Sequence, residues 1–278
     1  MSEGTLPSTA DILASTAILS PPDSAHKVVR LGEHLVAKYG EQVTLTEGQT
    51  MQYIAEHSKI PVPRVHATFT DQASQQTFIV MDFVHGETLA NLLPKLTQSE
   101  KDDIGLLVRD ALDKLRELPE PGYFGSIARG ACSHGMFWSP DGPDPLMSGP
   151  FDSEAAFNEG LLRKLATTPD MAPSYLSFLR TLFTQAFSGH RTTLCHGDLQ
   201  PKNIMVQRTG SKEDGTGSFT ISLIDWETSG WYPEYWEYCH SIIMGRFKPE
   251  WLEMVDKILP VYGYEYALMQ MIFHILYY

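Results

Sequence analysis

The sequence predicts an α+β protein in which strands and helices are segregated along the chain. Segments with the composition and alternation of strands cluster in the first third of the 278 residues. One helical segment interrupts them, and apolar residues at helical spacing dominate the rest of the chain. This order predicts an antiparallel sheet beside a group of helices.

The strand-rich part follows a small, polar lead over residues 1–16, which we expect to be partly ordered. Its helix covers residues 46–58, because Thr46 and Gln49 have the spacing of a capping box and Ile54 continues the apolar face. The helix ends before a Pro-rich segment, where helical backbone is disfavoured. The predicted strands span residues 16–20, 27–31, 34–39, 65–70 and 76–81.

Apolar faces at helical spacing predict the helices of the remaining chain. Thr97 and Glu100 form a second capping box at the start of a helix over residues 97–115. Further helices are predicted from about Ser153, over residues 175–186, over residues 251–259 and over residues 264–278.

Residues 122–150 form a loop-rich stretch in which Gly, Pro and Ser dominate. A structureless segment of this length inside a domain is usually functional or disordered. The aromatic residues Phe124, Phe137 and Trp138 make it a candidate wall of a substrate pocket, with disorder as the alternative. His134 has no visible ligand partner and is expected on the surface of the loop.

Composition excludes several classes of function. A net charge of −13 argues against nucleic acid as a partner, because surfaces that bind phosphate backbones are basic. No apolar run approaches the roughly 20 residues of a membrane span, and the N-terminus lacks a secretory pattern. Three widely spaced cysteines indicate a reducing compartment. We therefore expect a cytoplasmic protein with neither nucleic acid nor a membrane as its partner, of undetermined oligomeric state.

Two neighbouring segments carry the chemistry. Residues 194–206 read LCHGDLQPKNIMV, the pattern of strand, polar turn and strand, and residues 219–227 read FTISLIDWE, a half-buried strand with an acidic end. The polar, Gly-rich residues 207–218 predict a loop between them. If the two strands pair as a hairpin, Asn203 and Asp225 face one point, with Asp198 on the adjoining loop.

Oxygen ligands in this arrangement suit a hard cation. Magnesium prefers one or two carboxylates together with phosphate and water, so Asn203 and Asp225 are candidate ligands. Asp198 would then be free to accept a proton. The alternative is an ordinary turn, because Asp and Asn often bond nearby backbone in loops.

The pair HGDLQPKN and IDWE resembles the aminoglycoside phosphotransferase family, a small-molecule branch of the kinase-like fold. The resemblance implies two lobes, a sheet lobe with one helix over residues 1–84 and a mainly helical lobe over residues 85–278. It also implies that Asp198 is the catalytic base and that Asn203 and Asp225 bind Mg²⁺.

The same resemblance assigns nucleotide contacts in the first lobe. Lys38 on the second strand would hold phosphates, paired with Glu47; the stretch EGQTMQYIAEHSKIPVPRVH resembles fungal-type members of the family. Solvent exposure is the alternative for Lys38, and a favourable acid at a helix N-terminus is the alternative for Glu47. The hinge residues that would line the adenine site are Met81, Asp82, Phe83 and Val84.

The phosphate loop departs from the family pattern. Residues 20–24 read SPPDS and contain no glycine, although glycines let backbone approach phosphates and proline cannot donate an amide hydrogen. Phosphate contacts would then come from Lys38, magnesium and the amides of Ser24 or Ala25.

Three further residues are candidate substrate contacts. Glu227, Trp231 and Glu234 lie in or just after the IDWE motif, in a segment where rings and acids could hold a cationic group. The alternative is a helix start packed on the core, with Pro233 at its first position. The neighbouring His196 is expected to be structural.

These observations predict a phosphotransferase that moves the γ-phosphate of ATP or GTP, with Mg²⁺, to a hydroxyl of a small and possibly cationic metabolite. The alternative is an inactive or repurposed kinase-like protein that binds a metabolite, which the proline-containing phosphate loop favours. A protein kinase is less favoured, because Gln200 replaces the catalytic-loop lysine and IDWE replaces DFG.

Overall fold

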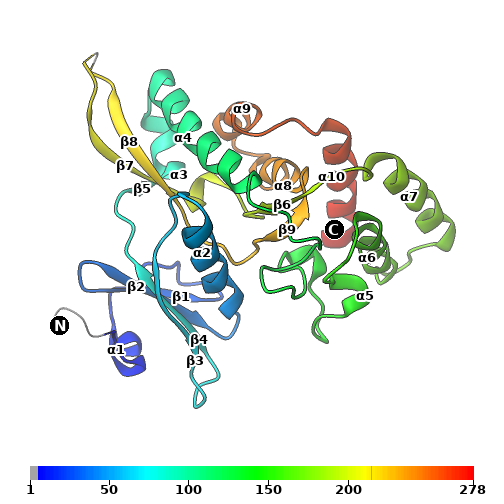
Figure 1. The fold of residues 1–278 in the computed structure, drawn as a ribbon, viewed down its shortest axis with the longest axis horizontal. Helices are drawn as coiled ribbons and strands as arrows, with labels where there is room; N and C mark the ends of the chain where they lie inside the picture. The colour runs from blue at the N-terminus through cyan, green and yellow to red at the C-terminus, as the bar shows by residue number, and fades with distance from the viewer. Residues whose placement is uncertain (1–5, 214) are drawn as a thin grey trace.

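The computed structural model describes residues 6–213 and 215–278 and has two lobes (Figure 1). The strand lobe, drawn in blue and cyan, lies at one end of the molecule, and most of the helices lie at the other. This confirms the α+β class and the antiparallel N-terminal sheet. The boundary between residues 84 and 85 stays a prediction.

The N-terminal sheet has the strand order β1-β2-β4-β3. One face packs against α1, whose Ile12 is fully buried with Val29 and Phe78. The other face receives α2 through Met51 and Ile54. The elements are α1 Thr9–Ala14, β1 Lys27–Leu31, β2 Leu35–Gly40, α2 Leu45–His57, β3 Val65–Thr70 and β4 Thr77–Asp82.

The lead, expected to be partly ordered, contains α1 within its described residues 6–16, because Ser8 and Asp11 form a capping box and Ile12 packs in the core. Two other local expectations for this lobe are wrong. The strand expected at residues 16–20 is reduced to one bridge between Ile18 and Val29. The cap expected at Thr46 is absent, because α2 begins one residue earlier and places Thr46 inside its first turn.

A second sheet, β5-β7-β8, connects the lobes. Its hairpin confirms the predicted pairing, with Ile204 opposite Leu223, although the loop expected over residues 207–218 is mostly strand. The Leu223 amide donates to the Pro61 carbonyl at 2.9 Å, which ties this hairpin to the first lobe. The strands are β5 Glu87–Thr88, β7 Ile204–Ser211 and β8 Gly217–Leu223.

The chain enters the second lobe through Gly86. This residue has φ +122°, and a Cβ there would collide with the Val206 carbonyl, so only glycine fits between the hinge and β7.

The helical lobe packs around one large core. Within the described residues, no helix is both long and apolar enough to cross a membrane. Its elements are α3 Leu89–Leu92, α4 Gln98–Arg116, α5 Pro145–Ser148, α6 Glu154–Ala166, α7 Pro173–Ala186, β6 Thr192–Cys195, β9 Gly230–Pro233, α8 Trp236–Gly245, α9 Pro249–Ile258 and α10 Gly263–Tyr277, with short 3₁₀ turns at Leu93–Lys95, Gly135–Phe137 and Pro201–Asn203.

Two of the three candidate pocket-wall residues in the loop-rich segment 122–150 belong to this core, whereas the third, Trp138, is 69% exposed. Phe124 and Phe137 are buried, and Phe137 stacks on Trp236 with ring centroids 5.9 Å apart. His134, expected on the surface, is buried against Trp236 and His240. Pro233 ends β9 instead of starting a helix, since residues 230–233 pair with β6.

Candidate active site

The loop that carries Asp198 is held in place by the side chains of Glu237 and His196. Glu237 on α8 accepts the amide hydrogens of His196 and Gly197. The His196 ring donates from Nε2 to the Ile224 carbonyl at 2.9 Å and accepts the Asp198 amide at Nδ1. Because a carbonyl can only accept, these contacts select one tautomer and confirm that His196 is structural.

The Asp198 carboxylate is held by three donors. Asn203 donates from Nδ2 to Asp198 Oδ2 at 3.0 Å, and the Lys202 ammonium lies 3.0 Å from the same oxygen. Gln200 donates to Oδ1, and Lys248 in turn donates to Gln200 at 3.2 Å. The carboxylate is therefore held in one orientation, and its side chain stays 18% exposed.

Asn203 and Asp225 lie together as the motifs predict. The Ile224 amide donates to the Asn203 carbonyl at 3.0 Å, directly beyond the last pair of the hairpin. Asp225 then turns with φ +67°, a left-handed conformation that Asp tolerates better than most residues. The next residue, Trp226, is fully buried against His196, which anchors this turn.

Lys38 is buried at the centre of the site and faces three carboxylates. Its Nζ lies 2.6 Å from Asp225, 3.0 Å from Glu47 and 3.0 Å from Glu227. The helix that carries Glu47 approaches the sheet closely, because Gly48 leaves room for Thr68. Of the two alternatives for Lys38, the structure thus excludes solvent exposure, since only 2% of its surface is accessible.

Three ionisable groups of this cluster have pKa values that are shifted in different directions. Burial disfavours the Lys38 charge, but the three carboxylates outweigh it and raise the pKa of Lys38. Burial raises the pKa of Glu47 to about 7, because this carboxyl has only a share of one ammonium and is repelled by Asp225. Burial opposes ionisation of Asp225 too, yet Lys38 lowers its pKa below the ordinary value. One oxygen of Glu47, Oε2, has no hydrogen-bond partner within the described residues.

A cleft of about 410 Å³ separates the lobes above this cluster. Among the hydrogen bonds of the described residues, none involves the peptide N–H or C=O of Val84, whereas the Phe83 amide donates to His34. The predicted nucleotide residues Lys38, Glu47, Met81, Asp82, Phe83 and Val84 all line the cleft, as do Asn203 and Asp225.

The three candidate substrate residues have different surroundings. Glu227 belongs to the Lys38 cluster and is 43% exposed. Trp231 is 1% exposed within the core, and Glu234 is held by Arg116 and Arg191. The substrate roles of all three residues stay predictions. The burial of Trp231 and the ion pairs of Glu234 do not favour such a role for these two residues.

Four residues of the site were outside the sequence prediction. Lys202 pairs with Asp198, Lys248 bonds Gln200, Glu237 supports the Asp198 loop, and His26 lines the cleft. The spacing of Lys202 after Asp198 was visible in the motif, but the other three come from elements distant in sequence.

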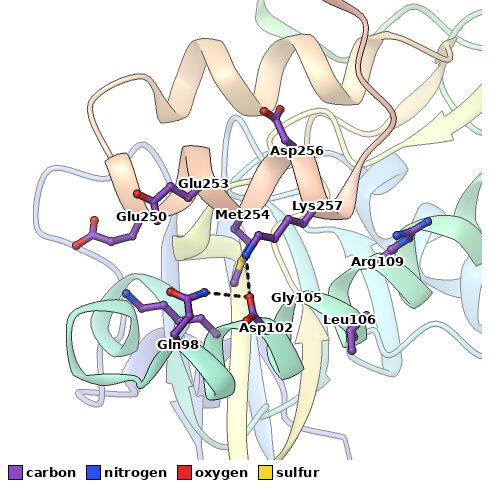
Figure 2. Close-up of a pocket in the computed structure, with 11 residues that line it drawn as sticks. Gln98, Asp102, Gly105, Leu106, Arg109, Glu250, Glu253, Met254, Asp256 and Lys257 are labelled. Atoms are coloured by element: carbon purple, nitrogen blue, oxygen red, sulfur yellow. Dashed lines mark hydrogen bonds and ion pairs between the residues drawn. The ribbon is translucent and has the colours of Figure 1, made fainter.

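A second hollow of about 460 Å³ lies between α4 and α9. Figure 2 shows Lys257 and Gln98 pointing toward Asp102, which accepts hydrogen bonds from both at 2.9 and 3.0 Å. The side chains of this groove are mostly charged, exposed residues.

Comparison with protein families and structures identifies one consistent group. The model of the phosphotransferase enzyme family matches residues 22–270. No curated protein matches the chain.

Solved structures of similar fold come from the same group. A thermostable mutant of aminoglycoside phosphotransferase APH(4)-Ia, in its apo form, has a TM-score of 0.59 at 15% identity, over 93% of this chain and 86% of the other. The GDP complex of aminoglycoside 2'-phosphotransferase-IIIa has a TM-score of 0.57 at 14% identity, over 97% and 86%. Another APH(4)-Ia mutant, in a ternary complex with ADP and hygromycin B, has a TM-score of 0.59 at 11% identity, over 96% and 89%. At these identities the likeness establishes the fold.

Proposed function

Because this chain belongs to the phosphotransferase enzyme family, we propose that it transfers the γ-phosphoryl group of ATP or GTP to a hydroxyl of a small metabolite. The observation that carries the proposal is the position of Asn203, which lines the cleft and also holds Asp198. A phosphate group in the cleft and a hydroxyl beside Asp198 would thus be neighbours. The ADP and GDP complexes of proteins with this fold support a nucleotide as the donor.

The nucleotide base would lie against residues 81–84. The unpaired N–H and C=O of Val84 offer a donor and an acceptor to the edge of a purine. Met81 supplies an apolar contact beneath it. Lys38, steadied by Glu47, would bind the α- and β-phosphates.

Magnesium fits the remaining oxygen ligands. The Asn203 amide donates to Asp198 through Nδ2, so its Oδ1 stays available, and Asp225 adds a carboxylate on the same side. When bound, the ion would neutralise charge on the phosphates.

Asp198 would orient the acceptor hydroxyl and take its proton. Gln200 and Asn203 fix the carboxylate, so little reorganisation is required at the moment of transfer. In this class of reaction, positioning and charge stabilisation provide most of the catalysis.

The surroundings of Asp198 also bear on the acceptor. Lys202 and Lys248 place two ammonium groups next to the base and its support. Like charges repel, so we favour a neutral or anionic acceptor over the cationic one that the sequence suggested.

Calorimetry with ATP and GTP, with and without Mg²⁺, tests the proposal. We expect Mg²⁺-dependent binding to wild type that is lost in Asp225→Asn and retained in Asp198→Asn. Turnover of an acceptor found by screening should fall by about 10²–10⁴-fold in Asp198→Asn. Asp102→Asn, in the distant groove, is the control. Absence of nucleotide binding would overturn the proposal and favour a repurposed metabolite-binding protein.

A further inference from the structure

His26 lies beside Asp225 and Glu227, the two partners of Lys38 that belong to the other lobe. Ligand atoms of His26, Asp225 and Glu227 all lie within 4.8 Å of one another. We infer that these three residues form a cation site, and that the imidazole makes it favour a first-row transition-metal ion, here Mn²⁺, over Mg²⁺, which binds nitrogen ligands more weakly. The existence of the site is argued from geometry alone, and only a role of the ion in phosphoryl transfer rests on the proposed function.

The position of His26 follows from the fold of the glycine-free loop. His26 directly precedes β1, which begins at Lys27. It lines the cleft together with Val28 of β1 and Lys38 of β2. The backbone of His26 lies beside Gly40 at the end of β2, where a Cβ would be 3.4 Å from the His26 Cα, an ordinary contact distance.

The charge around this position leaves room for a cation. Lys38 is the single ammonium that contacts Glu47, Asp225 and Glu227 within the described residues. Even without counting Glu47, the carboxylates of Asp225 and Glu227 outweigh this one ammonium and leave an excess of negative charge in a partly buried place. The buried Glu47 Oε2, 1% exposed as a residue, lacks any partner there, and such an orphaned oxygen is costly unless a donor or an ion satisfies it.

Free lone pairs are present on each proposed ligand. Lys38 contacts Asp225 through Oδ1 and Glu227 through Oε2, which leaves Oδ2 and Oε1 without a hydrogen bond in the described part of the chain. The His26 Nδ1 lies 3.7 Å from Glu227 Oε2, beyond hydrogen-bond range, so its lone pair is not committed to that carboxylate.

The ligand types determine which ion is favoured. An all-oxygen set suits Mg²⁺, whereas imidazole together with carboxylates suits first-row transition metals. Mn²⁺ accepts carboxylate and water ligands as Mg²⁺ does and also binds imidazole. His26 thereby distinguishes this site from one made by Asn203 and Asp225 alone.

Titration of the nucleotide-free protein with Mn²⁺, followed by electron paramagnetic resonance, tests the inference. We expect a bound-Mn²⁺ signal with nitrogen coupling from one imidazole. His26→Ala should weaken Mn²⁺ affinity by at least about tenfold and abolish the nitrogen coupling, with little change in Mg²⁺ affinity by competition. His26→Gln should restore part of the affinity through its oxygen, without nitrogen coupling. His34→Ala, which removes an exposed imidazole of the same lobe, should bind like wild type.

Equal Mn²⁺ affinity and coupling in wild type and His26→Ala would overturn the inference, and so would a wild-type protein that prefers Mg²⁺. Neither result affects the proposed function, since a kinase can use an all-oxygen site. Conversely, an imidazole-bound Mn²⁺ in a protein that binds no nucleotide would support the inference and contradict the proposed function.

Discussion

The two hollows of this protein have similar size and opposite chemistry. The groove between α4 and α9 encloses about 460 Å³ and the interlobe cleft about 410 Å³. In the groove, Asp102 is 50% exposed and has matched partners in Lys257 and Gln98. In the cleft, Lys38 and Glu47 are buried, and the one ammonium of Lys38 is shared among three carboxylates. The difference teaches that a functional site is marked by polar groups that folding leaves unbalanced, and not by volume.

Replacing one lysine in each region gives the largest contrast. Lys38→Met leaves the buried Glu47 without its ammonium, and loss of one partner of a buried pair costs about 3–5 kcal/mol of unfolding free energy. Lys257→Met removes an exposed pair and should cost about 0.2–1 kcal/mol. Urea denaturation of both variants measures this. Equal costs would show that the cleft charges are as well solvated as those of the groove.

The pH dependence of stability should have opposite sign in the two regions. The Glu47 pKa is about 7 in the folded protein and 4.5 ordinarily, so the folded chain holds a proton that the unfolded chain releases. The stability that this provides is present below pH 4.5 and is lost as pH rises toward 7. Urea denaturation at several pH values should therefore show that the unfolding free energy of wild type, relative to that of Glu47→Gln, falls by up to about 3 kcal/mol between pH 4.5 and pH 7.

Asp102 provides the matched case in the groove. Hydrogen bonds from Lys257 and Gln98 lower its pKa below 3.8. Its contribution is present above that pH and is lost as pH falls further. Denaturation of Asp102→Asn from pH 3 upward should thus show a difference from wild type that grows as pH rises, opposite in direction to that of Glu47→Gln. A common direction would contradict the assigned environments.

The helices that border the two hollows differ in a smaller way. Thr97 and Glu100 cap α4 reciprocally, with bonds of 3.3 and 3.1 Å. Thr44 begins α2 without a side-chain cap. Thr97→Ala should cost about 1 kcal/mol, and Thr44→Ala should stay within about 0.5 kcal/mol. Thermal unfolding of the two variants compares them, and an equal loss would mean that Thr44 caps its helix in solution.

Sequence patterns within a few residues predicted those strands and helix ends that are determined locally. Strand alternation located β1 and β3, and the Thr97 box located the start of α4, because these signals lie within a few residues. Thr46 carried a box of the same spacing, yet α2 begins at Leu45 and has no side-chain cap. Gly48 of this helix lies close to Thr68 of β3, and tertiary packing of this kind can override a local preference.

The site was predictable to the extent that its residues belong to motifs. Lys38, Asn203 and Asp225 line one cleft as expected. His26 and Glu237 carry no motif, and only the fold brings them to the site from distant segments. The burial of His134 was hidden for a related reason, because its loop is polar in composition while its partners lie on α8.

The attachments between the lobes also restrict their relative movement. The chain crosses at Gly86, and the Pro61 carbonyl holds the Leu223 amide at a separate point. The ion pair of Lys38 with Asp225 and the hydrogen bond from Ser229 to Thr50 cross between the lobes as well. Opening of the cleft therefore requires several separated contacts to break together, and a pair of spin labels at Ser24 and Lys202 would report it as a step in one distance.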